Sequence, residues 1–554
     1  MPARSGRLLT LATGMGAALP VIVSGVHAVQ IGWEPTDDKG IIATRAYDVL
    51  TTHTPLVGQY SMASLITGHA THGLGPMLYW LIALPARIGS PMTMAVTMAV
   101  INTLAVLATV ALARRRGGLV LMFATAVAIA LMCMSLAAES FHDIWNPAAP
   151  LLPFLALMFL CWCVACGEHR LLPVSILVAS FVAQAHLAYL PPALGMLVIG
   201  LVGLWMRAPR DRSLVRWGLA AALVGLACWL PAIVNQLSSQ PGNLSLVVRS
   251  ATAPVGTLGP RVGVRAVAGA IGWRPWWLIV PRTRWDRYHD VLVPPTDLRI
   301  ATTLLLLAAL GLLATLGWRR RRWDLAAAAL IGLVLCLTLA AVAAHTPVRP
   351  VLASTVGYTL WWGSMCGMWV WLILGWAVWI ALSPRLRTRG RALATVAGLA
   401  AVAAAGTAVA AGEKPDQHVA LYRPLARIAA RLDRTIQPGS TVRLEGTLDS
   451  ATLPFKPAVR FFLARRGVRA LSRGAYQRNG GWYELYRRPY ERTLELTDVR
   501  RRPGPRMSLL IGVGFRESGA GHSVFLWISP SAESNQRPRD MPAAQGRSGI
   551  PVER

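Results

Sequence analysis

The chain is poor in acidic residues and in lysine. Its 554 residues include 25 Asp and Glu against 55 Lys and Arg, and the only lysines are Lys39, Lys414 and Lys456. No Lys follows a Gly, which excludes a Walker-type phosphate loop, and no H-E-x-x-H sequence is present to bind zinc. The preference for Arg over Lys is typical of a GC-rich bacterial genome. The net charge of +30 would suggest nucleic acid for a soluble protein, but much of it falls in short loops between apolar runs.

Cysteine is also scarce and lies in or beside apolar runs. None of the seven cysteines follows residue 366, so the carboxyl-terminal part has no disulfide framework. Cys163 and Cys166 have a C-x-x-C spacing, but in an apolar helix such residues more often pack than bind metal. The histidines scattered through the first polar loop are not favoured as metal ligands either. We expect no cofactor, and a divalent metal ion is an alternative that the sequence does not favour.

Long apolar runs are what the sequence has in abundance. Hydrophobic residues make up 54% of the chain and charged residues 14%, and several runs reach the length of a membrane span. The first run, from Leu8 to Ile31, follows Arg4 and Arg7 and is expected to be an uncleaved span that starts in the cytoplasm. The sequence therefore predicts a polytopic α-helical membrane protein.

Arginine clusters predict the topology, because positive charge favours the cytoplasmic side. If every cluster is cytoplasmic, the spans between them must come in pairs. Residues 171–206 would form a helix of about 54 Å, longer than the hydrocarbon core of about 30 Å, so two spans broken at Pro191-Pro192 are expected. Residues 75–89 are then expected outside, along the membrane, and the total is about eleven transmembrane helices. The clusters lie at 114–116, 170, 207–216, 319–322 and 385–391.

This topology divides the chain into three parts. Residues 1–411 form the transmembrane domain, with outer loops at 32–91, 139–149, 235–297 and 345–357. Residues 412–529 are expected to form a small α/β domain outside the plasma membrane, with helices near 418–436 and 458–465 and strands near 441–445, 507–513 and 522–528. Residues 530–554 are rich in Pro, Ser and Arg and are expected to be a disordered tail.

Polar residues that could carry chemistry collect at the predicted outer ends of spans. Asp37 and Asp38 follow the first span and precede a stretch, including Arg45, that is expected to form an amphipathic helix on the membrane surface. The other candidates form four groups. They are His72; Glu139, His142, Asp143 and Asn146; Gln184 and His186; and the Trp273-Arg274-Pro275-Trp276-Trp277 stretch with Arg282, Arg284 and Arg287.

Each group also has an ordinary structural interpretation. Two adjacent Asp in a loop are often only solvated, and the Glu139–Asn146 stretch could be a polar turn ending at Pro147. The role of Gln184 and His186 could be limited to hydrogen bonds between helices. The Trp-Arg stretch could be an interfacial belt.

The order of these features resembles the membrane-embedded glycosyltransferases of the C-type superfamily, which include protein O-mannosyltransferases, the lipid A aminoarabinose transferase and arabinosyltransferases. An amino-terminal span is followed by a long outer loop with an Asp pair and then by H-x-x-G-P-x-x-Y-W. The resemblance covers about residues 1–235. The sequence departs from the family's H-P-P or H-P-G-P pattern at His72-Gly73-Leu74-Gly75-Pro76, which leaves the role of His72 open.

The resemblance implies transfer of a hexose or pentose from a polyprenyl-phosphate donor to a cell-envelope glycan, lipid or protein acceptor outside the membrane. It implies that Asp37 or Asp38 is the base, and that Glu139 or Asp143 is a second acidic site. A phosphate leaving group needs positive charge beside it and a base opposite it, so Arg45 or Arg274 could supply the charge, and the anomeric centre would be inverted.

The rival interpretation is a lipid or small-molecule transporter or flippase. Ion-coupled transporters usually carry ionisable groups deep within their spans, whereas these spans contain no central Asp, Glu, Lys or Arg. No repeated half is evident in the sequence. Both observations favour the enzyme.

Overall fold

The computed structural model describes residues 3–208, 211–281, 286–382, 391–412, 416–446, 452–471, 490–517 and 520–530. The chain divides into two compact units, Met1–Glu34 with Arg45–Val419, and Pro35–Thr44 with Ala420–Arg554. The first unit is helical. The second contains the carboxyl-terminal part of the chain and, in addition, ten residues of the first polar loop. The predicted disordered tail, apart from Pro530, lies outside the described residues, as do Arg282 and Arg284.

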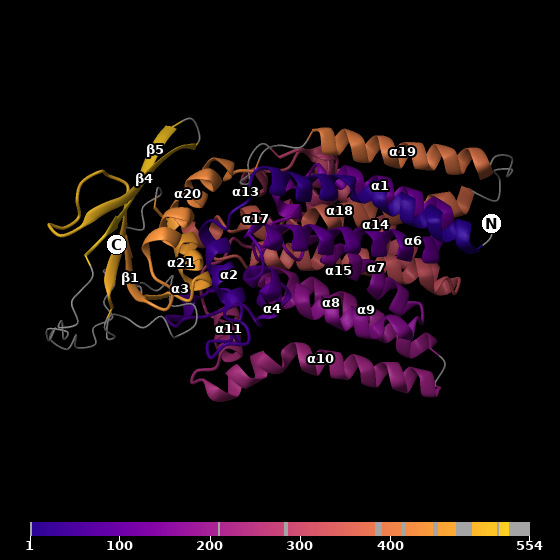
Figure 1. Cartoon of the computed structure of the whole chain (residues 1–554). Helices are drawn as coiled ribbons and strands as arrows, with labels where there is room; N and C mark the ends of the chain where they lie inside the picture. Colours follow the sequence, from indigo (N-terminus) through magenta and orange to yellow (C-terminus); the bar gives the residue numbers. More distant parts are fainter. Residues whose placement is uncertain are drawn as a thin grey trace. The chain divides into compact units, whose positions relative to one another are not determined.

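Eight helices in the described part of the first unit are long and apolar enough to cross a membrane. They run roughly parallel to one another (Figure 1). Several apolar helices of this length indicate a membrane-embedded protein. They include α1 (Ala3–Gln30), α6 (Met92–Cys133), α9 (Leu190–Arg207), α10 (Arg212–Ser238), α14 (Asp297–Arg319), α15 (Trp323–Ala344), α18 (Gly363–Leu382) and α19 (Arg391–Ala411).

Three helical segments bear on the predicted number of spans. α6 has 42 residues but is interrupted by Gly117 and Gly118, whose φ angles of −131° and +66° divide it into two helical halves. The break follows the Arg114–Arg116 cluster, where the sequence predicts a boundary between spans. α7 (Leu151–Ala165) and α8 (Leu172–Ala185) are apolar but have only 15 and 14 residues.

The outward face of α10 shows what surrounds the bundle. Val215, Leu219, Leu223 and Leu226 lie along one side of the helix and are 62%, 62%, 67% and 56% exposed. Their spacing of three or four residues places them on one continuous stripe. A continuous apolar stripe of this length in water would be unfavourable, so it indicates contact with lipid.

The core of the first unit is built around α7, all of whose residues are buried. Phe154 packs edge-on against Trp362, and Phe159 and Trp162 both contact Trp369 of α18 with ring centroids 5.0 and 5.6 Å apart. On another side, a Cβ on Gly203 of α9 would collide with the carbonyl of Ala165, so glycine permits the close approach of these two helices.

Short helices collect at one end of the bundle, which we call the loop end because α1 finishes there and α18 begins there (Figure 1). The stretch 75–89 forms two helices of five residues each, too short to span a membrane. The short elements at this end are α3 (Ser64–Thr67), α4 (Met77–Leu81), α5 (Ala83–Arg87), η1 (Ala138–Phe141), η3 (Leu187–Tyr189), α11 (Asn243–Ala251), α12 (Pro260–Ile271), η4 (Trp276–Leu278), α13 (Asp286–Leu292), α16 (Pro350–Ala353) and α17 (Val356–Thr359). The turn η2 (His169–Leu171) joins α7 to α8.

Two local predictions were wrong. The break between the two predicted spans falls at His186, which has extended backbone angles, and not at Pro191-Pro192. The two prolines lie in the first turn of α9, where a residue needs no backbone hydrogen-bond donor. The predicted surface helix exists as α2 (Asp37–Tyr47), but Lys39 and Arg45 are as buried as Ile41 and Ile42. α2 therefore does not present a polar face to solvent.

The second unit contains a five-stranded sheet with the order β2-β1-β3-β5-β4. β1 pairs in parallel with β2 and β3, whereas β5 pairs antiparallel with β3 and β4. The two helices and three strands predicted from sequence are present within a few residues, and β2 and β3 are additional. The elements are α20 (Val419–Thr435), β1 (Thr441–Gly446), α21 (Phe455–Arg465), β2 (Arg469–Leu471), β3 (Arg492–Thr497), β4 (Ser508–Glu517) and β5 (Ala520–Ile528).

Within this unit, the first turn of α2 lies against the start of α21. The Asp37 N–H donates to the Pro454 carbonyl at 3.2 Å. A Cβ on Gly40 would come within 2.6 and 2.7 Å of backbone atoms of Pro457 and Ala458. Asp37 itself has a φ of 48°, in the left-handed region that non-glycine residues rarely adopt. Only glycine at position 40 allows this approach.

We predict that Gly40→Ala destabilises the protein. Alanine normally favours a helix, but here its methyl group must displace backbone, and overpacking of this kind costs roughly 1–3 kcal/mol. Thermal unfolding of the purified full-length protein should show a lower Tm. The matched control is Gly521→Ala in β5, where a Cβ meets nothing within 4 Å. A Tm for Gly40→Ala equal to or above that of the parent would contradict the packing described here.

Candidate functional site

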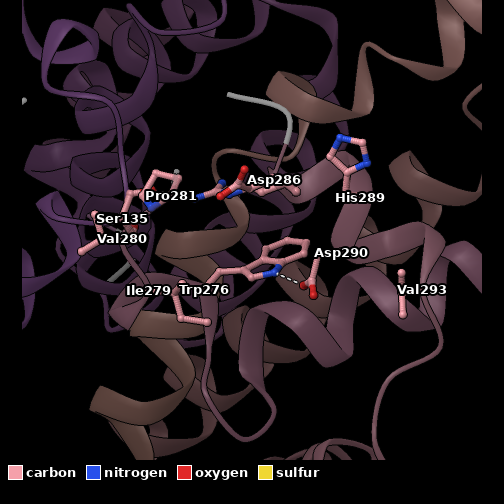
Figure 2. A pocket seen from close by; sticks show the side chains of 10 residues that line it. Ser135, Trp276, Ile279, Val280, Pro281, Asp286, His289, Asp290 and Val293 are labelled. Atoms are coloured by element: carbon pink, nitrogen blue, oxygen red, sulfur yellow. Dashed lines mark hydrogen bonds between the residues drawn. The ribbon is translucent and has the colours of Figure 1, made fainter. Parts of the chain in front are cut away.

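An open pocket of about 540 Å³ lies at the loop end of the first unit (Figure 2). Ser135, just after α6, lies on one side, and η4, α13 and the residues that follow each of them supply the rest. The lining is mixed, with the apolar residues Trp276, Ile279, Val280, Pro281 and Val293 and the polar residues Ser135, Asp286, Arg287, His289 and Asp290. Its size is within the range of small-molecule sites, and its mixed lining suits an amphiphilic ligand.

Arg287 is the buried cation of this pocket, with a side chain that is only 6% exposed. Its guanidinium donates to the Leu360 carbonyl at 2.9 Å, to the Ser135 carbonyl at 3.2 Å and to the Ser364 hydroxyl at 2.6 Å. All three acceptors are neutral. Of the five N–H donors of an Arg side chain, three are thus used by the described part of the protein, and two are left for a ligand.

The surroundings of Arg287 would favour an anionic partner. Burial lowers the pKa of Arg287 to about 10, while Tyr189 and Asp290 act in the opposite direction. The group therefore stays charged at neutral pH, although the charge is poorly solvated. Its guanidinium carbon lies 5.4 Å from the ring centroid of Trp276, within cation–π range. A bound anion would recover the electrostatic free energy lost on desolvation.

Asp290 holds the Trp276 side chain in place. One of its oxygens accepts from the Trp276 indole N–H at 2.5 Å, as the dashed line in Figure 2 shows, and the other accepts from Arg299 at 2.9 Å. A carboxylate with both oxygens used in this way holds the indole in place. Asp290 is therefore a structural acid, and Trp276 is a fixed wall.

Three of the residues predicted from sequence join helices and loops. The Gln184 carbonyl oxygen accepts from the Met77 N–H at 3.4 Å, and its amide donates to the Cys228 carbonyl at 2.8 Å. Asn146 donates to the Ala185 carbonyl at 3.3 Å. His186 lies among the rings of Tyr189 and Tyr358, and desolvation there lowers the pKa of its imidazole to about 4. These contacts favour the structural interpretation of Gln184 and Asn146.

The H-G-L-G-P stretch is also held by its neighbours. The backbone N–H of His72 donates to the Asn243 side chain at 2.8 Å, and the Asn243 amide returns bonds to the carbonyls of His72 and Gly73. A Cβ on Gly75 would collide with the Gln184 side chain. The stretch is therefore fixed between α8 and α11 through its backbone.

Glu139 and the neighbouring His142 hold the chain segment that precedes α20. The Glu139 carboxylate accepts from the Gln417 N–H at 2.7 Å, and His142 Nε2 lies 3.1 Å from the Asp416 carboxylate. His142 Nδ1 lies 2.7 Å from the Ser24 hydroxyl, which donates to the Ala138 carbonyl. The order Ser–His–Asp matches a hydrolase triad, but Ser24 is fully buried and gives its proton to a carbonyl. The set acts as a clamp.

The remaining predicted residues are not gathered in the pocket. Arg45 forms a buried ion pair with Asp48 at 3.1 Å, and Asp143 caps a turn by accepting from the Trp145 N–H at 2.9 Å. Arg274 is exposed, has a φ of 56°, and does not line the pocket. Asp37 and Asp38 belong to the second unit. Among the described residues, no group of three His, Cys, Asp or Glu is arranged to hold a metal ion.

The pocket depends mainly on residues that the sequence did not single out. Arg287 and Trp276 were noted only as part of the Trp-Arg stretch, and Ser135, Ser364, Asp286 and Asp290 were not noted at all. The sequence signal that could have pointed to these residues is the charged segment 286–290, D-R-Y-H-D, which lies between apolar runs. Comparison of the chain with protein-family models and with curated protein sequences finds no match in either case.

We predict that the clamp stabilises the first unit. Asp416→Ala leaves a buried His142 nitrogen without its acceptor, which should cost roughly 1–3 kcal/mol and lower the Tm of the full-length protein. The matched control is Asp433→Ala, which removes an ion pair with Arg466 at 2.8 Å whose carboxylate side chain is 54% exposed. Exposed pairs contribute little, so its Tm should stay near that of the parent. Equal Tm values for the two variants would show that the contact between His142 and Asp416 does not stabilise the first unit.

Proposed function

We propose that this protein is a membrane-embedded glycosyltransferase that uses a polyprenyl-phosphate-linked sugar and holds the donor phosphate at Arg287. The observation that supports this most is a buried guanidinium with neutral hydrogen-bond acceptors and two remaining donors, in an open pocket at the end of apolar helices. A phosphate supplies the missing negative charge, and the apolar residues of the lining suit the first part of a prenyl chain.

The chemistry requires little beyond positioning and charge. When the acceptor hydroxyl attacks the anomeric carbon, negative charge develops on the departing phosphate, and a fixed cation stabilises it more strongly in an apolar site than in water. A base on the opposite side of the sugar removes the hydroxyl proton, and the configuration is inverted. The products are a cell-envelope glycoside and a polyprenyl phosphate.

We further infer eleven spans, with the loop end on the outer face of the plasma membrane. The two halves of α6 cross separately, and α7 and α8 cross as shorter spans, with the 3-10 turn η2 extending α8. An odd number of spans from a cytoplasmic amino terminus leaves the carboxyl-terminal unit outside. The Arg clusters then all fall on the cytoplasmic side.

A fusion test checks this topology. Alkaline phosphatase fused after Gly412 should be active, because it needs disulfides that form only outside the cytoplasm, and a fluorescent protein fused there should be dark. The same pair fused after Ala208, between α9 and α10, should give the opposite result. An inactive phosphatase after Gly412 would place the carboxyl-terminal unit in the cytoplasm and refute the outer-face assignment.

We predict that Arg287→Gln weakens binding of the donor phosphate by roughly 10- to 100-fold, because hydrogen bonds to charged groups are worth about 1.5–3 kcal/mol. The measurement is the Kd of farnesyl phosphate for the purified protein. Arg265→Gln is the matched control, because Arg265 also donates to backbone carbonyls of α13, at 3.4 Å to Val291 and 2.6 Å to Leu292, but does not line the pocket. Arg274→Ala tests the sequence-based alternative in the same assay.

Assays on the same purified protein also distinguish a glycosyltransferase from a lipid carrier. The enzyme should transfer labelled sugar from a polyprenyl-phosphate donor to an acceptor in detergent, where no second compartment exists. A lipid carrier would bind farnesyl phosphate through Arg287 but would move lipid only between the leaflets of a vesicle. Binding without transfer in any donor and acceptor combination would favour the carrier. Equal Kd values for Arg287→Gln and the parent would remove Arg287 from the site.

A further inference from the structure

We propose that Ser364 is a positioning residue of the donor site, which acts through Arg287 and fixes its guanidinium before the donor phosphate binds. The inference rests on the proposed function for the identity of the anion. It is carried by a relay of two buried serine hydroxyls beside Arg287. Ser364 and Ser135 are 229 residues apart in the chain, and their hydroxyl oxygens meet at 2.8 Å.

The direction of the relay follows from counting hydrogens. The Ser135 hydroxyl donates to the Met132 carbonyl at 2.8 Å. Since a hydroxyl has only one hydrogen, Ser364 must be the donor in the contact between the two serines. The Ser364 oxygen in turn accepts from Arg287 at 2.6 Å. The hydrogen bonds therefore run in one direction, from the guanidinium to a backbone carbonyl, and bonds aligned in this way strengthen one another.

The relay determines which donors of Arg287 a ligand can use. Nη2 gives one hydrogen to the Ser364 hydroxyl and the other to the Ser135 carbonyl at 3.2 Å. Nη1 gives one hydrogen to the Leu360 carbonyl at 2.9 Å, so one N–H of Nη1 and the N–H of Nε remain for a ligand. Because both hydroxyl hydrogens are used within the relay, Ser364 orients the guanidinium and does not itself donate to the phosphate.

The first turn of α18 also holds the aromatic neighbour of Arg287. Ser364 follows Gly363, the first residue of that helix. A Cβ on Gly363 would come within 2.8 Å of the Cζ3 atom of Trp276, so the glycine lies directly against the indole. The same indole is within cation–π range of Arg287, and it lines the pocket together with Ser135 (Figure 2). Two consecutive residues of α18 therefore hold the guanidinium and the ring beside it.

Positioning affects affinity because an arginine side chain is long and flexible. A side chain that must be ordered at the moment of binding weakens affinity by roughly 2- to 12-fold relative to one that is already ordered. The relay orders Arg287 in advance. Its acceptors are neutral, so they leave the positive charge available to the phosphate.

The test measures the Kd of farnesyl phosphate for purified full-length protein. Ser364→Ala should raise this Kd by roughly 2- to 12-fold, and Ser364→Cys should act in the same direction, because a thiol keeps the shape of the side chain but is a weak acceptor. The matched control is Ser180→Ala in α8. Ser180 is also buried and accepts from the Trp229 indole at 3.0 Å, but it does not line the pocket, so the control should bind with the parent Kd.

A double-mutant cycle separates positioning from a general effect on the fold. If Ser364 acts through Arg287, adding Ser364→Ala to Arg287→Gln should leave the Kd of farnesyl phosphate unchanged, because no guanidinium remains to be oriented. A residue that only maintained the fold would weaken binding by the same factor in both backgrounds. That result, or a Kd for Ser364→Ala equal to or below that of the parent, would overturn the inference.

A second ligand keeps the inference testable if Arg287→Gln binds too weakly to measure. Farnesol has the same apolar chain without the phosphate, so Ser364→Ala should not change its affinity. An equal loss of affinity for farnesol and farnesyl phosphate would make Ser364 a structural residue of the pocket.

The outcomes also distinguish this inference from the proposed function. If Arg287→Gln weakens binding of farnesyl phosphate and Ser364→Ala does not, the positioning role falls and the function stands. If both variants behave as expected but the parent transfers no sugar, the positioning role stands and the glycosyltransferase falls. If the parent does not bind farnesyl phosphate, the proposed function falls, and the positioning role falls with it.

Discussion

A charge placed in an apolar medium loses the free energy of hydration, and this penalty governs the layout of the chain. The long helices satisfy their own backbone groups and carry almost no ionisable side chains in their central turns. Polar chemistry is therefore confined to the ends of the helices. At the loop end, short helices and turns replace spans, and the buried polar groups find one another there. The pocket lies at this end for the same reason.

Buried ionic groups in this structure are held in two different ways. Arg45 pairs with Asp48, and His142 contacts Asp416, so each has an acidic neighbour. Arg287 instead donates to two backbone carbonyls and a hydroxyl, which orient the guanidinium without neutralising it. An acidic partner would compete with an anionic ligand, whereas neutral acceptors leave the charge available. This difference is the physical basis for treating Arg287 as a binding group and the other two as structural groups.

Several polar side chains that a sequence reader would assign to catalysis instead maintain the loops. Gln184 links α4 to α10, and Asn146 donates to the Ala185 carbonyl. These side chains satisfy backbone groups that irregular loops would otherwise leave unpaired. A constellation of polar residues at the ends of spans is therefore weak evidence of a catalytic site until the partners of each residue are known.

The sequence by itself determined the helical class, the apolar segments and most of the carboxyl-terminal elements, because hydrophobic length and periodicity are local properties. It could also have indicated β3, where Leu494 and Leu496 alternate with Thr493 and Glu495, but the three residues of β2 are too few to carry a period. Only the tertiary structure decided that the chain breaks at His186, that Gly40 adjoins α21, and that Arg287 and Asp286 line a pocket with Trp276. The contact of Gly40 with α21 and the pocket depend on groups that are distant in the chain, as when Arg287 donates to the carbonyls of Ser135 and Leu360, 152 and 73 residues away. Pairing at such separations is set by packing in three dimensions, and no local pattern of residues encodes it.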